Sequence, residues 1–170
     1  MALIRSAVEG HEGVWADLGA GRGTFTRALA TVLGPGSLIH AVDSDAGAAR
    51  ELQAIARDDA RVVAVRGDFT GEMALPPLDG ILLANTLHFH RDAGAVLAGL
   101  VTRLRPGGRV VLVEYDRRGA SRWVPYPIGI AQLPALASAA GLDRFTVVES
   151  RPSNYEGVLY VAAAATVASR

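Results

Sequence analysis

Three alternating glycines follow directly on a short apolar run in the stretch Val14-Trp15-Ala16-Asp17-Leu18-Gly19-Ala20-Gly21-Arg22-Gly23-Thr24. Val14–Leu18 has the length of a buried strand, and Thr24–Leu33 repeats apolar residues with helical spacing. Glycines between a strand and a helix let the backbone approach a ligand closely. A plain tight turn would also accept glycine, but three at one turn carry an entropic cost that such a turn does not require. The stretch therefore predicts a ligand-binding loop.

The spacing of these glycines distinguishes two classes of ligand loop. Gly19, Gly21 and Gly23 follow the pattern G-x-G-x-G. The dinucleotide fingerprint is G-x-G-x-x-G, whose third glycine would fall at Thr24. A nicotinamide-dependent oxidoreductase is therefore disfavoured.

Apolar runs of strand length alternate along the chain with stretches of helical spacing, which is typical of an α/β fold with a parallel sheet flanked by helices. We expect strands at Val14–Leu18, Leu38–Asp43, Arg61–Val65, Gly80–Ala84, Arg109–Tyr115, Arg144–Ser150 and Gly157–Ala164. The expected helices are Ala2–Val8, Thr24–Leu33, Ala46–Arg57, Ala93–Leu104 and Ile130–Ala140.

Two connections differ from this regular alternation. Gly67–Leu78 contains Pro76 and Pro77 and is too short for a full crossover helix, so we expect an irregular link there. Only Arg151–Glu156 joins the last two strands, whereas a parallel crossover needs about a dozen residues. These strands should therefore form an antiparallel hairpin.

The length and composition narrow the class of protein. A chain of 170 residues suits a single domain, residues 1–170. Its 17 basic and 17 acidic side chains cancel, which disfavours nucleic acids and membranes as partners and favours a small molecule. The absence of cysteine excludes thiolate metal sites. No apolar run reaches the ~18 residues of a membrane span, and the first residues turn polar before a signal sequence could develop, so we expect a cytoplasmic protein.

The glycine loop resembles that of the class I S-adenosylmethionine-dependent methyltransferases, and the resemblance extends through almost the whole chain. In that family the loop follows the pattern (D/E)-x-G-x-G-x-G and surrounds the methionine part of the cofactor. The matching loop residues here are Asp17, Gly19, Ala20, Gly21 and Gly23. The resemblance implies a Rossmann-like sheet of seven strands in the order 3-2-1-4-5-7-6, with strand 7 antiparallel and helices on both faces. It also implies S-adenosylmethionine as cofactor and S-adenosylhomocysteine as product.

Two further acids match the family's cofactor positions. Asp43, followed by Ser44, stands where the family binds the ribose hydroxyls, although Asp43, Ser44 or Asp45 could each be a helix N-cap instead. Asp68 and Phe69 stand where the family contacts adenine, although an aspartate beside a glycine is often only a turn residue.

The strands after these positions resemble the family as well. Asn85 and His88 follow the fourth strand, where the family often has an Asn and a His facing the transferred methyl group. Leu104-Arg105-Pro106-Gly107-Gly108 matches the family's usual turn, and we expect it to end the preceding helix. The Trp123-Val124-Pro125-Tyr126-Pro127 stretch is similar to a small bacterial subgroup of these enzymes.

Polar and aromatic residues at the ends of the fourth and fifth strands are the candidates for catalysis. His88 and Glu114 could act as general base, with Tyr115 or Tyr126 orienting the substrate. The alternatives are structural: His88 could fill a polar niche, Glu114 could accept hydrogen bonds from loop amides, and Trp123 and Tyr126 could cap the core.

The functional prediction is methyl transfer to an oxygen, nitrogen or carbon nucleophile of a small molecule. The alternative is a module that binds the cofactor without turnover, or a partner subunit of a larger enzyme. We predict no metal, because His88 and His90 with Asp92 lack a convincing third ligand. The basic cluster Arg117, Arg118 and Arg122 is interpreted as solvated surface.

Overall fold

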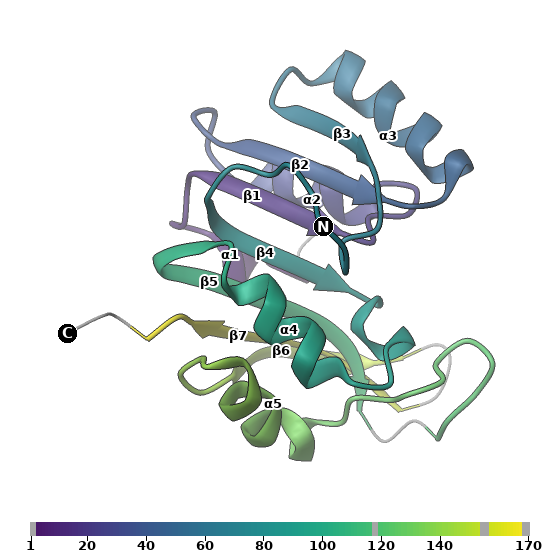
Figure 1. Ribbon diagram of the computed structural model, residues 1–170, viewed down its shortest axis with the longest axis vertical. Coiled ribbons are helices and arrows are strands. Elements are labelled where there is room, and N and C mark those ends of the chain that lie inside the picture. The colour runs from purple at the N-terminus through teal and green to yellow at the C-terminus, as the bar shows by residue number, and fades with distance from the viewer. Residues whose placement is uncertain (1–2, 117–118, 154–156, 168–170) are drawn as a thin grey trace.

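A computed structural model describes residues 3–116, 119–153 and 157–167 of the chain. Within these residues seven strands form one sheet in the order β3-β2-β1-β4-β5-β7-β6 (Figure 1). The strands are β1 (Val14–Leu18), β2 (Leu38–Asp43), β3 (Val62–Arg66), β4 (Leu78–Ala84), β5 (Leu104–Asp116), β6 (Thr146–Pro152) and β7 (Val158–Ala165). The expected strand order is confirmed.

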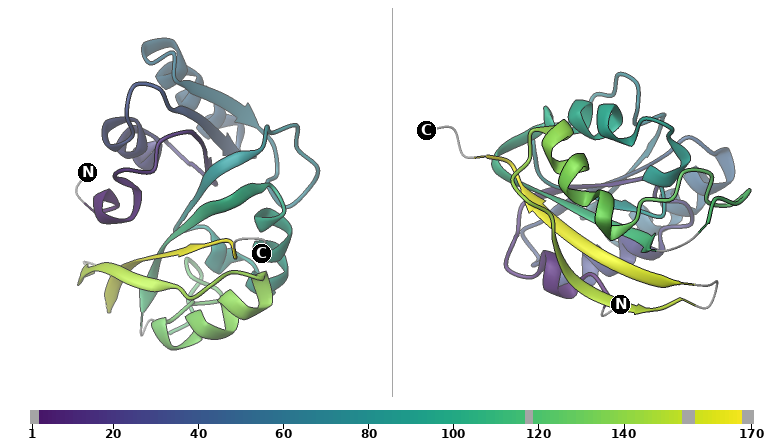
Figure 2. Two further views of the ribbon diagram at one scale, coloured as in Figure 1. Left: turned by 90° about the vertical axis from the view of Figure 1, so that its left-hand side faces the viewer. Right: turned by 90° about the horizontal axis from the view of Figure 1, so that it is seen from below.

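The pairing directions also agree with the sequence. The pairs β1–β2, β1–β4, β2–β3 and β4–β5 are parallel, so their carboxyl ends meet at one edge of the sheet. β7 runs antiparallel to both β5 and β6 and forms the outer hairpin with β6 (Figure 2). Of the short link expected between these two strands, residues 154–156 lie outside the described part of the chain.

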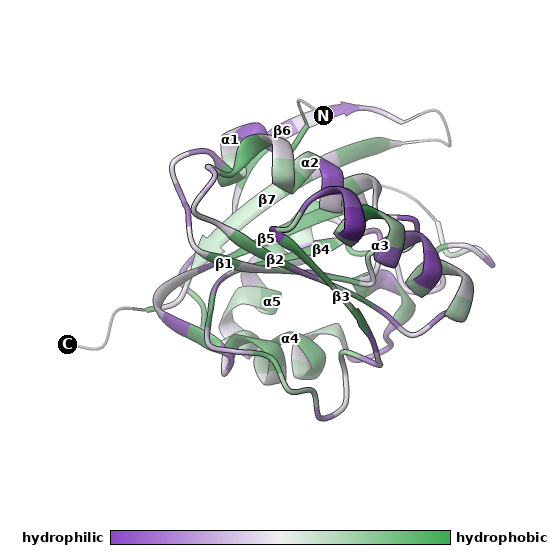
Figure 3. Cartoon of the chain, turned by 90° about the horizontal axis from the view of Figure 1, so that it is seen from above, coloured by the Kyte–Doolittle hydropathy of each residue, from purple (hydrophilic) through white to green (hydrophobic). Residues whose placement is uncertain are grey.

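Helices cover both faces of the sheet (Figure 3). One face carries α1 (Arg5–Val8), α2 (Thr24–Val32) and α3 (Ala46–Asp58), and the other carries α4 (Ala93–Val101) and α5 (Leu133–Ala140). There are also two 3₁₀ turns. The turn η1 (Leu87–Phe89) follows β4, and the turn η2 (Ile130–Gln132) directly precedes α5. None of the helices among the described residues has the length and apolarity that crossing a membrane requires.

Alternate strand residues supply two separate cores, one on each face. Trp15 and Leu82 pack with α1, α2 and α3, whereas Ala16 and Leu83 pack with α4 and α5. All four side chains are fully buried. The sheet is therefore apolar on both sides, as the continuous apolar runs of the sequence predict.

The end of α4 is the clearest difference from the sequence prediction. The helix ends at Val101 rather than Leu104, and β5 already begins at Leu104, which pairs with Leu78. The pairing of Leu104 with β4 is incompatible with a helix that continues to this residue, and the Arg103 guanidinium donates to the carbonyl oxygens of Met73 (3.0 Å) and Gly71 (3.2 Å). The Pro106-Gly107-Gly108 turn is thus a bulge within β5 rather than a helix end. The same arginine fastens the irregular link between β3 and β4, which contains no helix, as expected.

We predict opposite effects on stability for two glycine-to-alanine substitutions. A Cβ at Gly80 would overlap the indole ring of Trp15, which is fully buried and donates through Nε1 to the His11 carbonyl. Gly80→Ala should therefore lower the free energy of unfolding by about 1–3 kcal/mol. A Cβ at Gly99, in α4, meets nothing within 4 Å, so Gly99→Ala should raise it by about 0.5–1 kcal/mol.

Urea denaturation followed by tryptophan fluorescence measures both changes. A Gly80→Ala protein as stable as the wild type would show that Trp15 is not held against β4 as described.

Candidate active site

The glycine loop passes from β1 to α2 at the carboxyl edge of the sheet. The backbone N–H groups of Gly19 and Ala20 both donate to the Val42 carbonyl at the end of β2, at 2.9 Å each. A Cβ at Gly19 would overlap Thr86, which follows β4, and a Cβ at Gly23 would overlap Ile55 of α3. These two glycines therefore allow the loop to pack against its neighbours.

Gly21 has a different environment. Its φ of 53° lies in the left-handed region, and a Cβ there would meet no atom within 4 Å. Its N–H donates to Asp43 Oδ2 at 2.8 Å. The positive φ favours glycine at this position, and the open space beside Gly21, called the cradle below, lets a ligand approach the backbone.

Asp43 joins the glycine loop to the end of β2. Besides Gly21, it accepts a hydrogen bond from the Asp45 N–H at 2.9 Å through Oδ1. The N-cap of α3 is Asp45, whose carboxylate accepts from the Ala48 N–H at 2.8 Å, and Ser44 is exposed. Of the three candidate caps, Asp45 takes that role. The carboxylate of Asp43 is thereby oriented at the loop, with one backbone donor on each oxygen.

Asp17 lies beneath the loop and is almost completely buried. Its Oδ2 accepts a hydrogen bond of 2.6 Å from the Thr26 hydroxyl in the first turn of α2. Burial raises the pKa of Asp17 to about 7; the Thr26 hydrogen bond opposes this rise and the nearby Asp43 charge adds to it. The Asp17 carboxyl therefore changes between its protonated and charged forms near neutral pH.

Asp68 and Phe69 follow β3 at the same edge. Asp68 Oδ1 accepts from the N–H (2.9 Å) and the hydroxyl (2.7 Å) of Thr70, and these hydrogen bonds lower the pKa of Asp68. Phe69 is buried, with its ring edge-on to His90 at 5.4 Å. The structure shows a turn at Asp68; contacts of these two residues with an adenine remain predictions.

Asn85 occupies a strained position directly after β4. It is the one non-glycine residue with a positive φ (54°) among those described, and its buried side-chain oxygen Oδ1 has no hydrogen-bond partner. A left-handed backbone and an unpaired buried acceptor both cost free energy, and such features concentrate where proteins bind ligands. Asn85 therefore offers an acceptor to a bound molecule.

The two candidate bases form one buried pair. His88 in η1 and Glu114 in β5 are 2% and 0% exposed, and His88 Nδ1 lies 2.6 Å from Glu114 Oε2. The His88 backbone N–H also donates to Glu114 Oε1 at 3.2 Å. A carboxylate that accepts at both oxygens places the imidazole proton on Nδ1, which leaves a lone pair on Nε2. No described residue hydrogen-bonds Nε2.

The segment after β5 passes beside this pair. The Tyr126 N–H donates to the His88 carbonyl at 3.0 Å, and the Tyr160 hydroxyl donates to the Ile128 carbonyl at 2.8 Å. The Tyr115 ring lies 6.3 Å from the His88 ring. The structure thus brings together the side chains of His88, Glu114 and Tyr115 and places the Tyr126 backbone beside His88, while the catalytic roles of all four residues remain predictions.

Trp123 does not cap the core. Its side chain is 71% exposed, with the Arg122 guanidinium 5.4 Å from its ring centre. Arg117 and Arg118 of the expected basic cluster lie outside the described residues. Val124 and Ile128, which are buried, hold this segment to the core instead.

Two hydroxyl side chains of the site were missed by the sequence analysis. Thr26 supports Asp17, and Thr86 contacts Gly19, its Oγ1 lying 3.3 Å from the Gly19 carbonyl. Both are buried. A polar residue at an otherwise apolar, inward-facing helix position was the available signal for Thr26.

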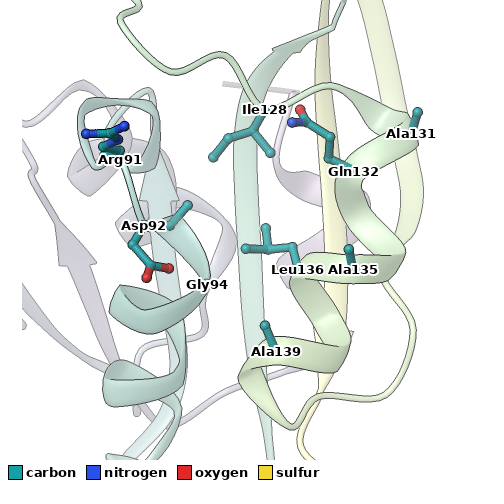
Figure 4. A pocket seen from close by; sticks show the side chains of 10 residues that line it. Arg91, Asp92, Gly94, Ile128, Ala131, Gln132, Ala135, Leu136 and Ala139 are labelled. Carbon is teal, nitrogen blue, oxygen red and sulfur yellow. The ribbon is translucent and has the colours of Figure 1, made fainter.

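Other features lie apart from the glycine loop. No group of three or more His, Asp or Glu side chains in the described chain is arranged to hold a metal ion, and Asp92 caps α4 through the Ala95 N–H. A pocket between α4 and α5 is lined mainly by small side chains, with Arg91, Asp92 and Gln132 at its polar end (Figure 4). It contains no residue of the loop or of the His88–Glu114 pair.

The family model described as a methyltransferase domain matches residues 16–110, more than half of the chain. No protein of curated function matches the chain.

Among solved structures, 1,6-didemethyltoxoflavin-N1-methyltransferase from Burkholderia thailandensis is 29% identical, with a TM-score of 0.76, over 96% of this chain and 75% of that one. It was solved with bound 1,6-didemethyltoxoflavin and S-adenosylhomocysteine. A SAM-dependent methyltransferase from Aquifex aeolicus is 16% identical, with a TM-score of 0.73, over 94% and 85% of the two chains. A riboflavin-derivative dimethyltransferase from Streptomyces davawensis is 24% identical, with a TM-score of 0.70, over 93% and 50%. The last two show similarity of fold.

We predict that Asp17 makes stability fall as pH rises. A folded-state pKa of about 7, against about 4 when unfolded, means that the folded protein binds the proton more tightly. The contribution is fully present at acid pH and is lost as pH rises through 7. The variant Asp17→Asn keeps an acceptor for Thr26 but cannot titrate. Between about pH 5 and pH 8, the free energy of unfolding of the wild type should fall by roughly 2–3 kcal/mol relative to that of Asp17→Asn.

Urea denaturation at a series of pH values checks this, with Asp143→Asn at an exposed position as the control. A difference between wild type and Asp17→Asn that does not change with pH would contradict the buried, proton-holding carboxyl.

Proposed function

Because the chain belongs to the methyltransferase domain family, we propose that it transfers the methyl group of S-adenosylmethionine to an oxygen, nitrogen or carbon nucleophile of a small molecule. The observation that carries the acceptor side is the buried His88–Glu114 pair, which lies where β4 and β5 end. A base in this position suits an acceptor that loses a proton, with O–H and N–H groups fitting best because they exchange protons readily with imidazole.

The residues present fit the cofactor. Gly21 faces open space, and Asn85 Oδ1 is a buried acceptor without a partner. Asp43 retains acceptor capacity on both oxygens for the ribose hydroxyls, because each oxygen accepts only one backbone N–H. In this proposal the methionine part lies against the loop residues Asp17, Gly19, Ala20, Gly21 and Gly23, the ribose against Asp43 and Ser44, and the adenine against Asp68 and Phe69. When bound, the cofactor supplies a methyl group activated by a sulfonium.

The chain's own residues then orient the acceptor and remove its proton. Methyl transfer is an in-line displacement, so holding the two reacting atoms close and aligned contributes much of the rate. As the acceptor forms its new bond to carbon, His88 Nε2 takes the proton that the acceptor loses. Glu114 stabilises the resulting imidazolium through Nδ1. The Tyr115 ring lies beside the imidazole and the Tyr126 backbone is hydrogen-bonded to the His88 carbonyl, and in this proposal both tyrosines orient the acceptor.

Further properties belong to the same proposal. The substrate is a small molecule rather than a nucleic acid or a membrane, which the balanced charge supports. The Burkholderia thailandensis relative, at 29% identity, acts on such a molecule. We propose a bacterial, cytoplasmic protein in which residues 1–170 form one domain and no metal takes part.

We predict that Gly21→Ala weakens binding of S-adenosylhomocysteine by at least about tenfold, because the added methyl group occupies the cradle. Gly10→Ala is the matched control. Gly10 also has a positive φ (79°) and open space around it, but it lies in the turn before β1. Both substitutions should lower stability by roughly 1 kcal/mol through backbone strain. Only Gly21→Ala should change affinity, measured by isothermal titration calorimetry.

Equal affinity in Gly21→Ala and Gly10→Ala would remove the loop from the cofactor site. No binding of S-adenosylhomocysteine to the wild type would contradict the proposed function as a whole.

We predict that Glu114→Gln and His88→Gln each lower turnover by roughly 10²–10⁴-fold while cofactor affinity stays within about twofold. Turnover is the transfer of labelled methyl into an acceptor found in a small-molecule extract, measured both without and with EDTA. Acceptor analogues with more acidic O–H or N–H groups should recover part of the lost rate, which a purely structural role of the pair would not produce.

Full activity in both variants would mean that proximity alone drives the transfer. Loss of wild-type turnover on adding EDTA would contradict the metal-free proposal.

A further inference from the structure

Exposed aromatic side chains gather at one edge of the sheet. Six large apolar side chains of the described residues are exposed, and three of these are aromatic: Phe89, Trp123 and Tyr126. All three come from segments that follow the carboxyl ends of β4 and β5. The other three are valines on or next to the strands β3, β6 and β7. The segments that carry the exposed aromatic side chains therefore follow the same two strand ends as the proposed acceptor site.

Two of these residues contact His88, Phe89 through its ring and Tyr126 through its backbone. The Phe89 ring centre lies 4.5 Å from that of His88, and the Tyr126 N–H donates to the His88 carbonyl at 3.0 Å. Phe89 is 51% and Tyr126 43% exposed. We call Phe89 and Tyr126 the aromatic rim. Trp123 is not included, because its ring lies against the Arg122 guanidinium rather than against His88.

The exposure of the rim contrasts with the burial of the base. Exposed aromatic rings beside a polar site mark a ligand surface, since they supply apolar area and stack against other rings. Only 2% of the His88 side chain is exposed, so an acceptor that reaches its Nε2 must fit between closely packed side chains. A flat ring that carries its O–H or N–H in its own plane needs less width than a framework of tetrahedral carbons.

We propose that the methyl acceptor is a planar aromatic or heteroaromatic molecule, which stacks on the aromatic rim while its O–H or N–H meets His88 Nε2. This inference rests on the proposed function and narrows its substrate class. A saturated acceptor would gain neither the stacking nor the edge-on access. A second copy of the chain could also cover exposed rings, and the experiment separates that case.

The experiment compares 2-naphthol with its saturated counterpart decahydro-2-naphthol, on protein saturated with S-adenosylhomocysteine. Ligand-observed NMR titration gives the affinities. 2-Naphthol should bind at least about fivefold more tightly, and Phe89→Leu and Tyr126→Leu should each weaken it by roughly 3- to 10-fold. Val147→Ala, at an exposed position on β6, is the control and should leave the affinity unchanged.

Calorimetry with S-adenosylhomocysteine on the same samples distinguishes a failure of the proposed function from a failure of this inference alone. If this molecule does not bind, the proposed function fails and the inference fails with it. If it binds but 2-naphthol binds no better than decahydro-2-naphthol, or equally well to both rim variants, only the inference is overturned. The inference is also overturned if the rim variants leave 2-naphthol binding unchanged and convert a dimer into a monomer in sedimentation, because the rim is then a subunit contact.

Discussion

The whole site depends on how closely the turn between β1 and α2 approaches its neighbours. Gly19 touches Thr86 at the end of β4, and Gly23 touches Ile55 in α3, with no room for a side chain at either position. The N–H groups of Gly19 and Ala20 are both bound by the Val42 carbonyl of β2. Three strand ends are thereby drawn to one place, and Gly21, the glycine of this loop that packing leaves free, faces open space. A bulkier turn would separate these strand ends and open the site.

Two buried acids near this edge are stabilised in different ways. Glu114 accepts hydrogen bonds from the imidazole and the backbone N–H of His88, two donors that suit a carboxylate. Asp17 has the Thr26 hydroxyl as its recorded donor and the Asp43 carboxylate nearby, an arrangement that favours its protonated form. The two acids therefore differ in their surroundings: Glu114 has two donors from His88, whereas Asp17 has one donor from Thr26 and a raised pKa.

The strand order and the two helical layers could be predicted because they follow from apolar periodicity, link lengths and the family resemblance. The position of α4's end could not, since β5 begins early through the pairing of Leu104 with Leu78, a long-range contact that no local pattern records. The same holds for the site. Residues at strand ends could be picked out one by one, because parallel strands bring their carboxyl ends together. The pairing of His88 with Glu114, 26 residues apart, depends on the β4–β5 register and the geometry of η1, and was not predictable.

Besides the buried side chains of Val124 and Ile128, backbone hydrogen bonds attach the segment after β5 to the rest of the protein. The Tyr126 N–H, the Ile128 carbonyl and the Ile130 N–H make its hydrogen bonds to His88, Tyr160 and Asp116. Main-chain anchors do not depend on which side chains the segment carries. The one exposed position between the buried Val124 and Ile128, Tyr126, can therefore be exchanged while the path of the chain stays the same. In the proposed site, substitutions in this segment would change the contacts offered to the acceptor without altering the fold of the enzyme.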